Sequence, residues 1–333
     1  MGSDTQWLIA PDAFKGTYSA KEVTLAIAAG LREVDSSAAV DLCPSADGGE
    51  GTLEVLVERL GGRCTSAEAH DPLGRPISAP LGWLQDGTSA IVAVAGASGL
   101  GLLTPSERDA ELASTIGTGE LIAAAVRAGA TRVIIAAGGS ASTDGGRGAI
   151  HAIQASGGLR GAQLTVLADV TTTFERAAEV FAPQKGADAA TVRRLTARLH
   201  GQAPALPRDP RGLPMTGAAG GLAGGLWARY GATLVPGAEW VLDALGFDER
   251  IARAGAVITG EGRLDAQTLE GKLVSQIAGR ARGAGVPVHA VVGGCALTRA
   301  ERAQLALATV HEAHDRLELA GAGRALAATA LSP

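Results

Sequence analysis

Three observations predict an α/β protein built on a parallel sheet, with a second, smaller domain inserted into the first. Short apolar runs are followed repeatedly by a loop that combines glycine with Asp, Glu or Ser, and then by a helical pattern. Strands that alternate with helices form parallel sheets with covered faces. The 333 residues exceed an average single domain, and the proline-containing segments Arg63–Trp83 and Gly201–Pro214 interrupt the pattern.

The first repeat of this pattern lies near the start of the chain. We expect a strand over Trp7–Ala10, and the loop Pro11–Gly16 separates it from a helix. Ser19 and Glu22 have the spacing of a capping box, which begins a helix. Apolar residues recur along the following segment at helical spacing, so this helix should bury one face.

Three further repeats follow in the same order. The loop Asp47–Gly51 precedes a helix that Gly61 is expected to end. The other two expected strands and their loops are Arg132–Ala137 with Gly138–Gly146, and Ala256–Thr259 with Gly260–Asp265. Ligands of parallel sheets bind beyond the carboxyl ends of the strands. A single loop of this kind is equally well an ordinary turn, but four together predict a binding site at one sheet edge.

Composition excludes several classes of function. The formal charge is −5, no run of Lys and Arg occurs and 3% of residues are aromatic, so we expect no nucleic-acid partner. The cysteines Cys43, Cys64 and Cys295 are far apart, which indicates neither disulfides nor a zinc site. Met1–Trp7 is unlike a signal peptide, and the longest apolar tract, Ala90–Leu103, is too short for a membrane span. We therefore expect a cytoplasmic protein with no membrane partner.

The usual nucleotide-binding fingerprints are absent. The sequence has no G-x-x-x-x-G-K-[ST] and no G-x-G-x-x-G after a strand, which disfavours a P-loop NTPase and a nicotinamide-dependent dehydrogenase. Glycine loops at helix N-termini can still bind phosphate, and carboxylates beside them can hold Mg²⁺. The candidate carboxylates are Asp47, Glu50, Asp144, Asp169, Glu261 and Asp265, and the candidate cations are Lys15, Lys185, Arg263 and Lys272. These residues predict a phosphate-handling enzyme and leave the acceptor open.

Eight short motifs, in order along the chain, resemble those of the bacterial glycerate kinase family. They begin at Ile9, Ala46, Gly117, Gly138, Asp169, Pro183, Gly217 and Thr259, and read IAPDAFKG, ADGGEGT, GTGE, GGSASTDGG, DVT, PQKGA, GAAGG and TGEGRLD. The resemblance implies ATP-dependent phosphorylation of D-glycerate, with Mg²⁺ and with 2-phosphoglycerate as the favoured product. It also implies a Rossmann-like parallel-sheet domain and a second α/β domain, with the active site between them.

The resemblance also assigns domains and site residues. The Rossmann-like domain is expected over residues 1–65, 105–158 and 245–333, and the inserted domain over 66–104 and 159–244. The catalytic candidates are Lys15, Asp47, Asp144 and Asp169, of which Asp169 and Asp144 would hold the metal. Asp169 follows an apolar run, where burial could make it basic, so it is the first choice for a Mg²⁺ ligand or a general base. Substrate and nucleotide would be bound by Asp12, Gly48, Gly49, Glu50, Gly139, Ser140, Lys185, Gly260, Glu261, Arg263 and Asp265. A homodimer is an open alternative for the assembly.

Simpler roles are kept beside these assignments. Asp144 could only cap a helix, Glu50 could only favour a helix dipole, and Asp12 with Lys15 could form a salt bridge. His311 and His314 are expected on a solvated helix, without a metal role. The segment 172–178 after Asp169, together with Ala93, Ile116 and Thr143, departs from the family pattern. A kinase of another small hydroxy acid, or a non-catalytic nucleotide- or acid-binding protein, therefore stays an alternative.

Overall fold

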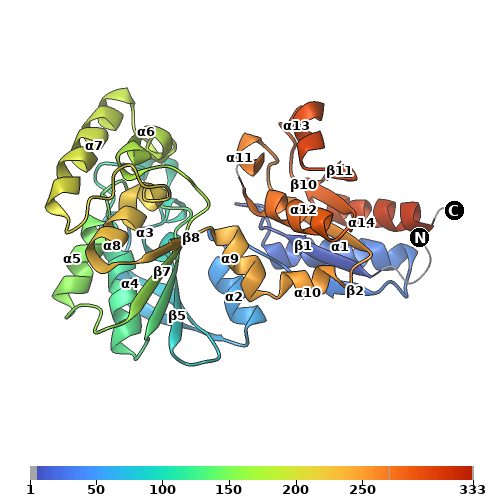
Figure 1. The fold of residues 1–333 in the computed structure, drawn as a ribbon, viewed down its shortest axis with the longest axis horizontal. Coiled ribbons are helices and arrows are strands. Elements are labelled where there is room, and N and C mark those ends of the chain that lie inside the picture. Colours follow the sequence, from blue (N-terminus) through green and yellow to red (C-terminus); the bar gives the residue numbers. More distant parts are fainter. Residues whose placement is uncertain (1–5, 270, 332–333) are drawn as a thin grey trace. The chain divides into compact units, whose positions relative to one another are not determined.

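A computed structural model describes residues 6–269 and 271–331 and confirms the predicted α/β class. The chain divides into two compact units. Unit 1 comprises the described residues up to Asp47 and from Ala238 onward, and unit 2 comprises Gly48–Gly237 (Figure 1). The insertion expected from the sequence is therefore present, although the inserted unit is the longer of the two.

The division differs from the expected domain boundaries at residues 48–65 and 105–158, which lie in unit 2, and at 238–244, which lie in unit 1. Strand pairing explains the difference at 105–158. Strand β6 (Arg132–Ala136) pairs in parallel with β5 (Ser89–Ala93) on one side and with β7 (Gln163–Leu167) on the other. The helices before and after β6 therefore also belong to unit 2. The repeated pattern of strand, loop and helix in the sequence does not reveal which sheet a strand joins.

Unit 1 contains a five-stranded parallel sheet in the order β11-β10-β9-β1-β2. Its strands are β1 (Trp7–Pro11), β2 (Val40–Leu42), β9 (Ala256–Glu261), β10 (Val288–Val292) and β11 (Thr309–Glu312). The sheet is covered on both faces, because alternate residues of β10 enter different cores: Val291 packs with one cluster, and Ala290 and Val292 pack with the other.

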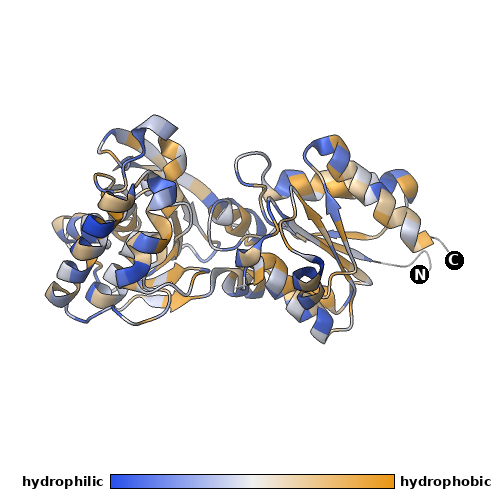
Figure 2. Ribbon diagram, turned by 90° about the horizontal axis from the view of Figure 1, so that it is seen from above, coloured by the Kyte–Doolittle hydropathy of each residue, from blue (hydrophilic) through white to orange (hydrophobic). Residues whose placement is uncertain are grey.

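Two helices that are far apart in the sequence pack together on one face of this sheet. Helix α1 (Ala20–Val34) has the predicted capping box of Ser19 and Glu22, and it contributes to the same core as α14 (Arg316–Leu331). The opposite face and the sheet ends carry shorter helices: α9 (Gly237–Ala244), α10 (Phe247–Ile251), α11 (Ala266–Leu269), α12 (Leu273–Gly283) and α13 (Arg299–Gln304). Figure 2 shows hydrophobic strands and helices with mixed faces, as this packing requires.

Replacing Gly30 by alanine is expected to destabilise unit 1. A Cβ at Gly30 of α1 would lie 1.8 Å from the carbonyl oxygen of Ala320 in α14, so the two helices would have to separate. We expect the free energy of unfolding to fall by about 2–3 kcal/mol, even though alanine favours helix. Gly279→Ala in α12 is the matched control, because a Cβ there meets nothing within 4 Å. Urea unfolding should show the control at or above wild-type stability, and equal stability of Gly30→Ala would contradict the close packing.

Unit 2 contains a six-stranded sheet in the order β3-β4-β5-β6-β7-β8. The proline-containing segment forms an antiparallel pair, β3 (Arg63–His70) and β4 (Pro76–Trp83), while β5 to β8 (Thr233–Val235) run in parallel. The helices are α2 (Thr52–Arg59), α3 (Val94–Ser98), α4 (Ile116–Arg127), α5 (Arg147–Ala155), α6 (Ala177–Phe181), α7 (Ala189–Gln202) and α8 (Leu222–Tyr230). Within the described ranges, none of the helices in either unit has the length and apolar character that a membrane crossing requires.

Candidate active site

The sheet of unit 1 reverses its winding direction between β1 and β9. From β1 the chain moves to β2 on one side, whereas β9, β10 and β11 follow one another on the other side. Such a switch point leaves a crevice at the carboxyl ends of the two strands, where ligands of open α/β sheets bind. Asp12 directly follows β1, and Glu261 is the last residue of β9. The structure therefore places two predicted site residues at the two sides of the switch point.

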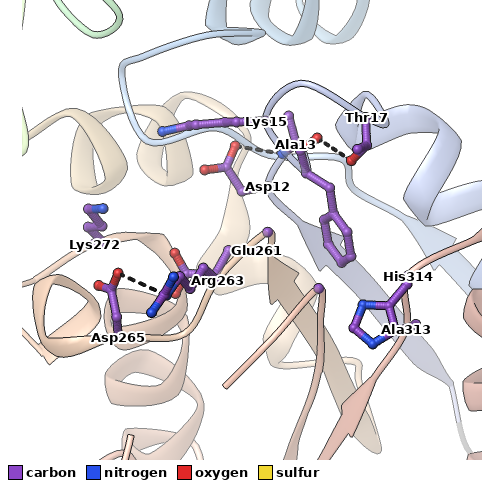
Figure 3. Close-up of a pocket in the computed structure, with 13 residues that line it drawn as sticks. Asp12, Ala13, Lys15, Thr17, Glu261, Arg263, Asp265, Lys272, Ala313 and His314 are labelled. Atoms are coloured by element: carbon purple, nitrogen blue, oxygen red, sulfur yellow. Dashed lines mark hydrogen bonds and ion pairs between the residues drawn. The ribbon is translucent and has the colours of Figure 1, made fainter. Parts of the chain in front are cut away.

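A pocket of about 490 Å³ opens at this edge (Figure 3). Its lining comes from the loops after four strands: Asp12, Ala13, Phe14, Lys15, Thr17, Glu261, Gly262, Arg263, Asp265, Lys272, Gly293, Ala313 and His314. Two of the four predicted acidic glycine loops thus meet in one pocket. Gly260 allows β9 to lie close to β10, since a Cβ there would come within 1.9 Å of the Val291 carbonyl oxygen.

The loop after β1 is held by its own backbone. Phe14 is buried in the core of unit 1, and its N–H donates to the carbonyl oxygen of Tyr18. Gly16 adopts a φ of +81°, which few other residues accept. The next residue, Lys15, forms an ion pair with Asp47. Lys15 Nζ lies 3.0 Å from Asp47 Oδ2. The loop thereby presents one buried carboxylate, Asp12, and one half-exposed ammonium group.

Burial and mutual repulsion shift the pKa values of this cluster. Burial raises the pKa of Asp12 well above its ordinary value, and Asp47 raises it further, while Lys15 opposes both. Burial raises the pKa of Glu261 to about 7, despite the hydrogen bond of 2.6 Å from Thr268 Oγ1 to its Oε1. Desolvation lowers the pKa of Lys15, but Asp47 and Asp12 outweigh it and the net pKa is raised. The cluster can therefore exchange a proton near neutral pH.

The wall after β9 carries the remaining cations of the pocket. Arg263 has a side chain that is 72% exposed, and its Nε lies 4.0 Å from Asp265 Oδ2. Lys272 donates from Nζ to the side-chain oxygen of Gln267 at 2.8 Å. Gln267 is exposed, and the contact of Arg263 with the half-buried Asp265 is long, so an anionic ligand could replace both contacts at small cost. Arg263, Lys272 and Lys15 are thus the cations that the sequence predicts for the loops after β9 and β1.

Sequence reasoning missed one residue that lines the pocket, His314, and one hydrogen-bond partner of a site carboxylate, Thr268. His314 lines the pocket, and His311 lies in β11, so the expected solvated helix is wrong for both. The run of residues around Val310 is too short for its pattern of apolar residues to distinguish a strand from a helix. Thr268, the hydrogen-bond donor to Glu261, was also missed, because nothing in the sequence marks a threonine of a short helix as a partner of a carboxylate.

The glycine-rich loop Gly138–Gly146 follows β6 and therefore belongs to the sheet of unit 2. The expectation that all four acidic loops open at the edge of one sheet is therefore wrong. The strands β1 and β9 belong to one sheet and β6 to another, so their carboxyl ends do not share an edge. Within unit 2, Gly48 and Gly49 approach this loop: the Gly138 N–H donates to the Gly48 carbonyl oxygen at 3.3 Å. Glu50 next to them is exposed.

Lys185 connects two of the predicted motifs inside unit 2. It ends a short 3₁₀ turn, η4 (Pro183–Lys185), and only 2% of it is exposed. Its Nζ donates to Ser140 Oγ at 2.8 Å and to the Ser142 carbonyl oxygen at 2.6 Å. Burial lowers the pKa of Lys185 to about 7, against the attraction of Asp144. The loop after β6, which includes the left-handed Gly139, is thus fixed by a buried amine.

Asp144 joins the beginnings of two helices. Its Oδ2 accepts hydrogen bonds from Thr115 N at 3.0 Å, Thr115 Oγ1 at 2.8 Å and Gly148 N at 3.1 Å, and its Oδ1 accepts one from Gly146 N at 3.0 Å. Thr115 precedes α4, and Gly146 precedes α5. Both carboxylate oxygens are engaged with the protein, which agrees with the capping role that the sequence left open.

Mg²⁺ prefers oxygen ligands and often takes only one or two protein carboxylates, the rest being water and phosphate. Within residues 6–269 and 271–331 no three or more His, Cys, Asp or Glu side chains form a metal-binding group. Asp169, which follows β7 after one residue and is half-buried, fits a site of the sparse kind. Asp144 fits less well, because the protein already donates to both of its oxygens.

The fold and the two groups of residues define a two-unit α/β protein whose candidate sites follow the carboxyl ends of parallel strands. The model of the Glycerate kinase family matches residues 7–158 and 153–329. The chain belongs to the glycerate kinase family, as the ordered motifs predict.

Individual relatives cover most of the chain. A glycerate kinase of Halalkalibacterium halodurans is 37% identical over 86% of this chain and 84% of its own length, and the glycerate 2-kinase of Escherichia coli K12 is 36% identical with the same coverage. A crystal structure of a putative glycerate kinase 2 from Salmonella typhimurium LT2 is 34% identical and superposes with a TM-score of 0.81 over 98% of both chains. The whole two-unit architecture is therefore shared with that protein.

Proposed function

We propose that this protein is a glycerate kinase that transfers the γ-phosphoryl group of ATP to a hydroxyl of D-glycerate, giving 2-phosphoglycerate. The observation that carries the proposal is the pocket at the β1–β9 switch point, where Asp12, Lys15 and Glu261 of two family motifs meet. Relatives named glycerate kinase align with the chain at 36–37% identity over 86% of its length. A phosphoryl transferase needs cations and a carboxylate beside the attacking hydroxyl, and the pocket supplies both.

The residues of the pocket have different proposed tasks. Arg263, Lys272 and Lys15 would bind the anionic groups of the ligands, because all three residues line the pocket and carry a positive charge. Asp47 would hold Lys15 in place through its ion pair. Gly262, which lines the pocket, would let a ligand approach the backbone closely, while Gly260 holds β9 against β10. Asp265 would orient Arg263.

The loop of unit 2 would contribute through its backbone and through Ser140. Lys185 fixes Ser140 by a hydrogen bond, and the neighbouring Gly139 is exposed and left-handed. Glycine-rich turns of this kind commonly bind phosphate. Mg²⁺ held near Asp169 would supply neutralisation of the phosphate charge when bound. We further propose that the two units are the two domains of the enzyme and that the enzyme is cytoplasmic. Whether it acts as a homodimer is a question for light scattering.

The proposal is tested by ATP consumption that depends on D-glycerate. Purified protein with ATP and Mg²⁺ should form ADP only when D-glycerate is added, and NMR of the product should show the phosphate at the 2-position. Turnover of threonate, lactate or tartronate but not glycerate would support the second candidate, a kinase of another hydroxy acid, which the segment after Asp169 favours. ATP binding without turnover of any of these acids would refute the kinase proposal.

A further inference from the structure

The carboxylate of Asp12 has an arrangement that no other acidic residue of the pocket shares. Asp12 is only 3% exposed, yet it lines the pocket. The Ala13 N–H donates to its Oδ1 at 2.7 Å, and in the described part of the chain its Oδ2 accepts no hydrogen bond. Figure 3 shows the carboxylate turned into the space between the loops after β1 and β9. A buried, oriented carboxylate with one unengaged oxygen facing a pocket is suited to receive a proton.

We propose that Asp12 is the general base of phosphoryl transfer and that the pocket at the β1–β9 switch point holds the acceptor hydroxy acid. This inference rests on the proposed function. The proton of the acceptor hydroxyl passes to Asp12 Oδ2 as the oxygen forms its bond to the γ-phosphorus. The bond between the γ-phosphorus and the β–γ bridging oxygen breaks, and its electron pair leaves on ADP.

The other carboxylates of the cluster are less suited to this step. Glu261 accepts a short hydrogen bond from Thr268, which points one of its oxygens away from a ligand. Asp47 is bound to the ammonium group of Lys15. Asp265 accepts from the Gln267 N–H at 3.0 Å and faces Arg263. Each of these has a positioning task. Among the described acidic residues that line the pocket, Asp12 combines burial, a backbone hydrogen bond to one oxygen and a second oxygen that accepts no hydrogen bond.

The charges around Asp12 adjust its basicity. Asp47 and Glu261 repel its negative form, and Lys15 attracts it; these are the charged groups that act on it from the ends of β2, β9 and its own loop. Burial and the two carboxylates raise the pKa of Asp12, which makes it a stronger base than an exposed aspartate. Lys15 opposes that shift.

The same charges indicate which acceptor fits. Arg263 and Lys272 on the wall after β9 can bind one carboxylate, and a guanidinium group matches a carboxylate in two parallel hydrogen bonds. Asp12, Asp47 and Glu261 would repel a second negative group placed beside them. A monocarboxylate with an adjacent hydroxyl, such as glycerate, is therefore favoured over a dicarboxylate such as tartronate.

Asp12→Asn tests the inference in the full-length protein. Asparagine keeps the acceptor for the Ala13 N–H and removes the base, so kcat for D-glycerate should fall by roughly 10²–10⁴-fold. The dissociation constant of glycerate, measured by calorimetry, should change less than about threefold, because binding uses the opposite wall. Asp12→Glu, which restores a carboxylate at altered reach, should recover part of kcat. Asp188→Asn, at an exposed helix start of unit 2, is the control and should keep wild-type kcat.

The outcomes separate the two levels of the argument. A wild-type enzyme that phosphorylates glycerate, with an Asp12→Asn variant within tenfold of its kcat, would overturn the base assignment and leave the kinase proposal standing. A folded Asp12→Asn variant that no longer binds glycerate would overturn it too, since Asp12 would then be a binding residue. A wild-type protein that phosphorylates none of the acids would remove the proposed function and this inference with it.

Discussion

Asp144→Ala is expected to lower the free energy of unfolding of unit 2 by about 3–5 kcal/mol. The substitution leaves four donors without their acceptor: the N–H and hydroxyl of Thr115 and the N–H groups of Gly146 and Gly148. An unsatisfied buried donor costs about 1–3 kcal/mol. Water entering the space around Asp144 would recover part of this loss. The expected total is therefore smaller than the full cost of four unsatisfied donors.

Hydrogen exchange measures the effect locally, which matters because two units need not unfold together. Amides at the start of α4 and α5 should exchange faster in Asp144→Ala than in the wild type. Asp188→Ala is the matched control: this aspartate caps α7 through the Thr191 N–H but is exposed, so its loss should cost only about 1 kcal/mol. Equal exchange in both variants would show that Asp144 is not a structural connection between the helices.

The sequence predicts local elements of this fold better than their assembly. The capping box of Ser19 and Glu22 fixes the start of α1, and the expected strand Trp7–Ala10 is β1 with one residue added. Both features depend on neighbours in the sequence. The pairing of β6 with β5 and β7 is different, because it depends on packing between residues that are far apart in the sequence. For this reason the repeated pattern of strand, loop and helix predicts one sheet, whereas the strands form two.

The candidate site shows the same limit. Asp12, Lys15 and Glu261 belong to glycine-rich motifs that follow strands. Because ligands bind beyond the carboxyl ends of parallel strands, the sequence is enough to expect these three residues together. The contact of Lys185 with Ser140 joins residues 45 positions apart, and no periodicity encodes it. His314 reaches the pocket only because β11 is a strand, and four residues are too few for sequence periodicity to show that.

The stability of unit 2 is expected to depend on pH through Lys185. Burial lowers the pKa of Lys185 to about 7 in the folded state, whereas the unfolded chain has the ordinary value near 10.5. Between these values the unfolded state binds more protons at this site, so folding becomes more favourable as pH rises. The cost of the buried charge is present in full below pH 7 and is gradually lost above it. Each pH unit in this window is worth up to about 1.4 kcal/mol.

Lys185→Met removes this dependence and keeps an unbranched side chain that is only one atom shorter. Relative to the variant, the wild type should gain about 2–3 kcal/mol between pH 7 and pH 9, as measured by urea unfolding at each pH. Lys21→Met in α1 is the control for the same replacement at an exposed lysine of unit 1. A difference for Lys185→Met that does not change with pH would mean that the amine keeps its proton, and that Ser140 and Ser142 are held by a charged group at neutral pH.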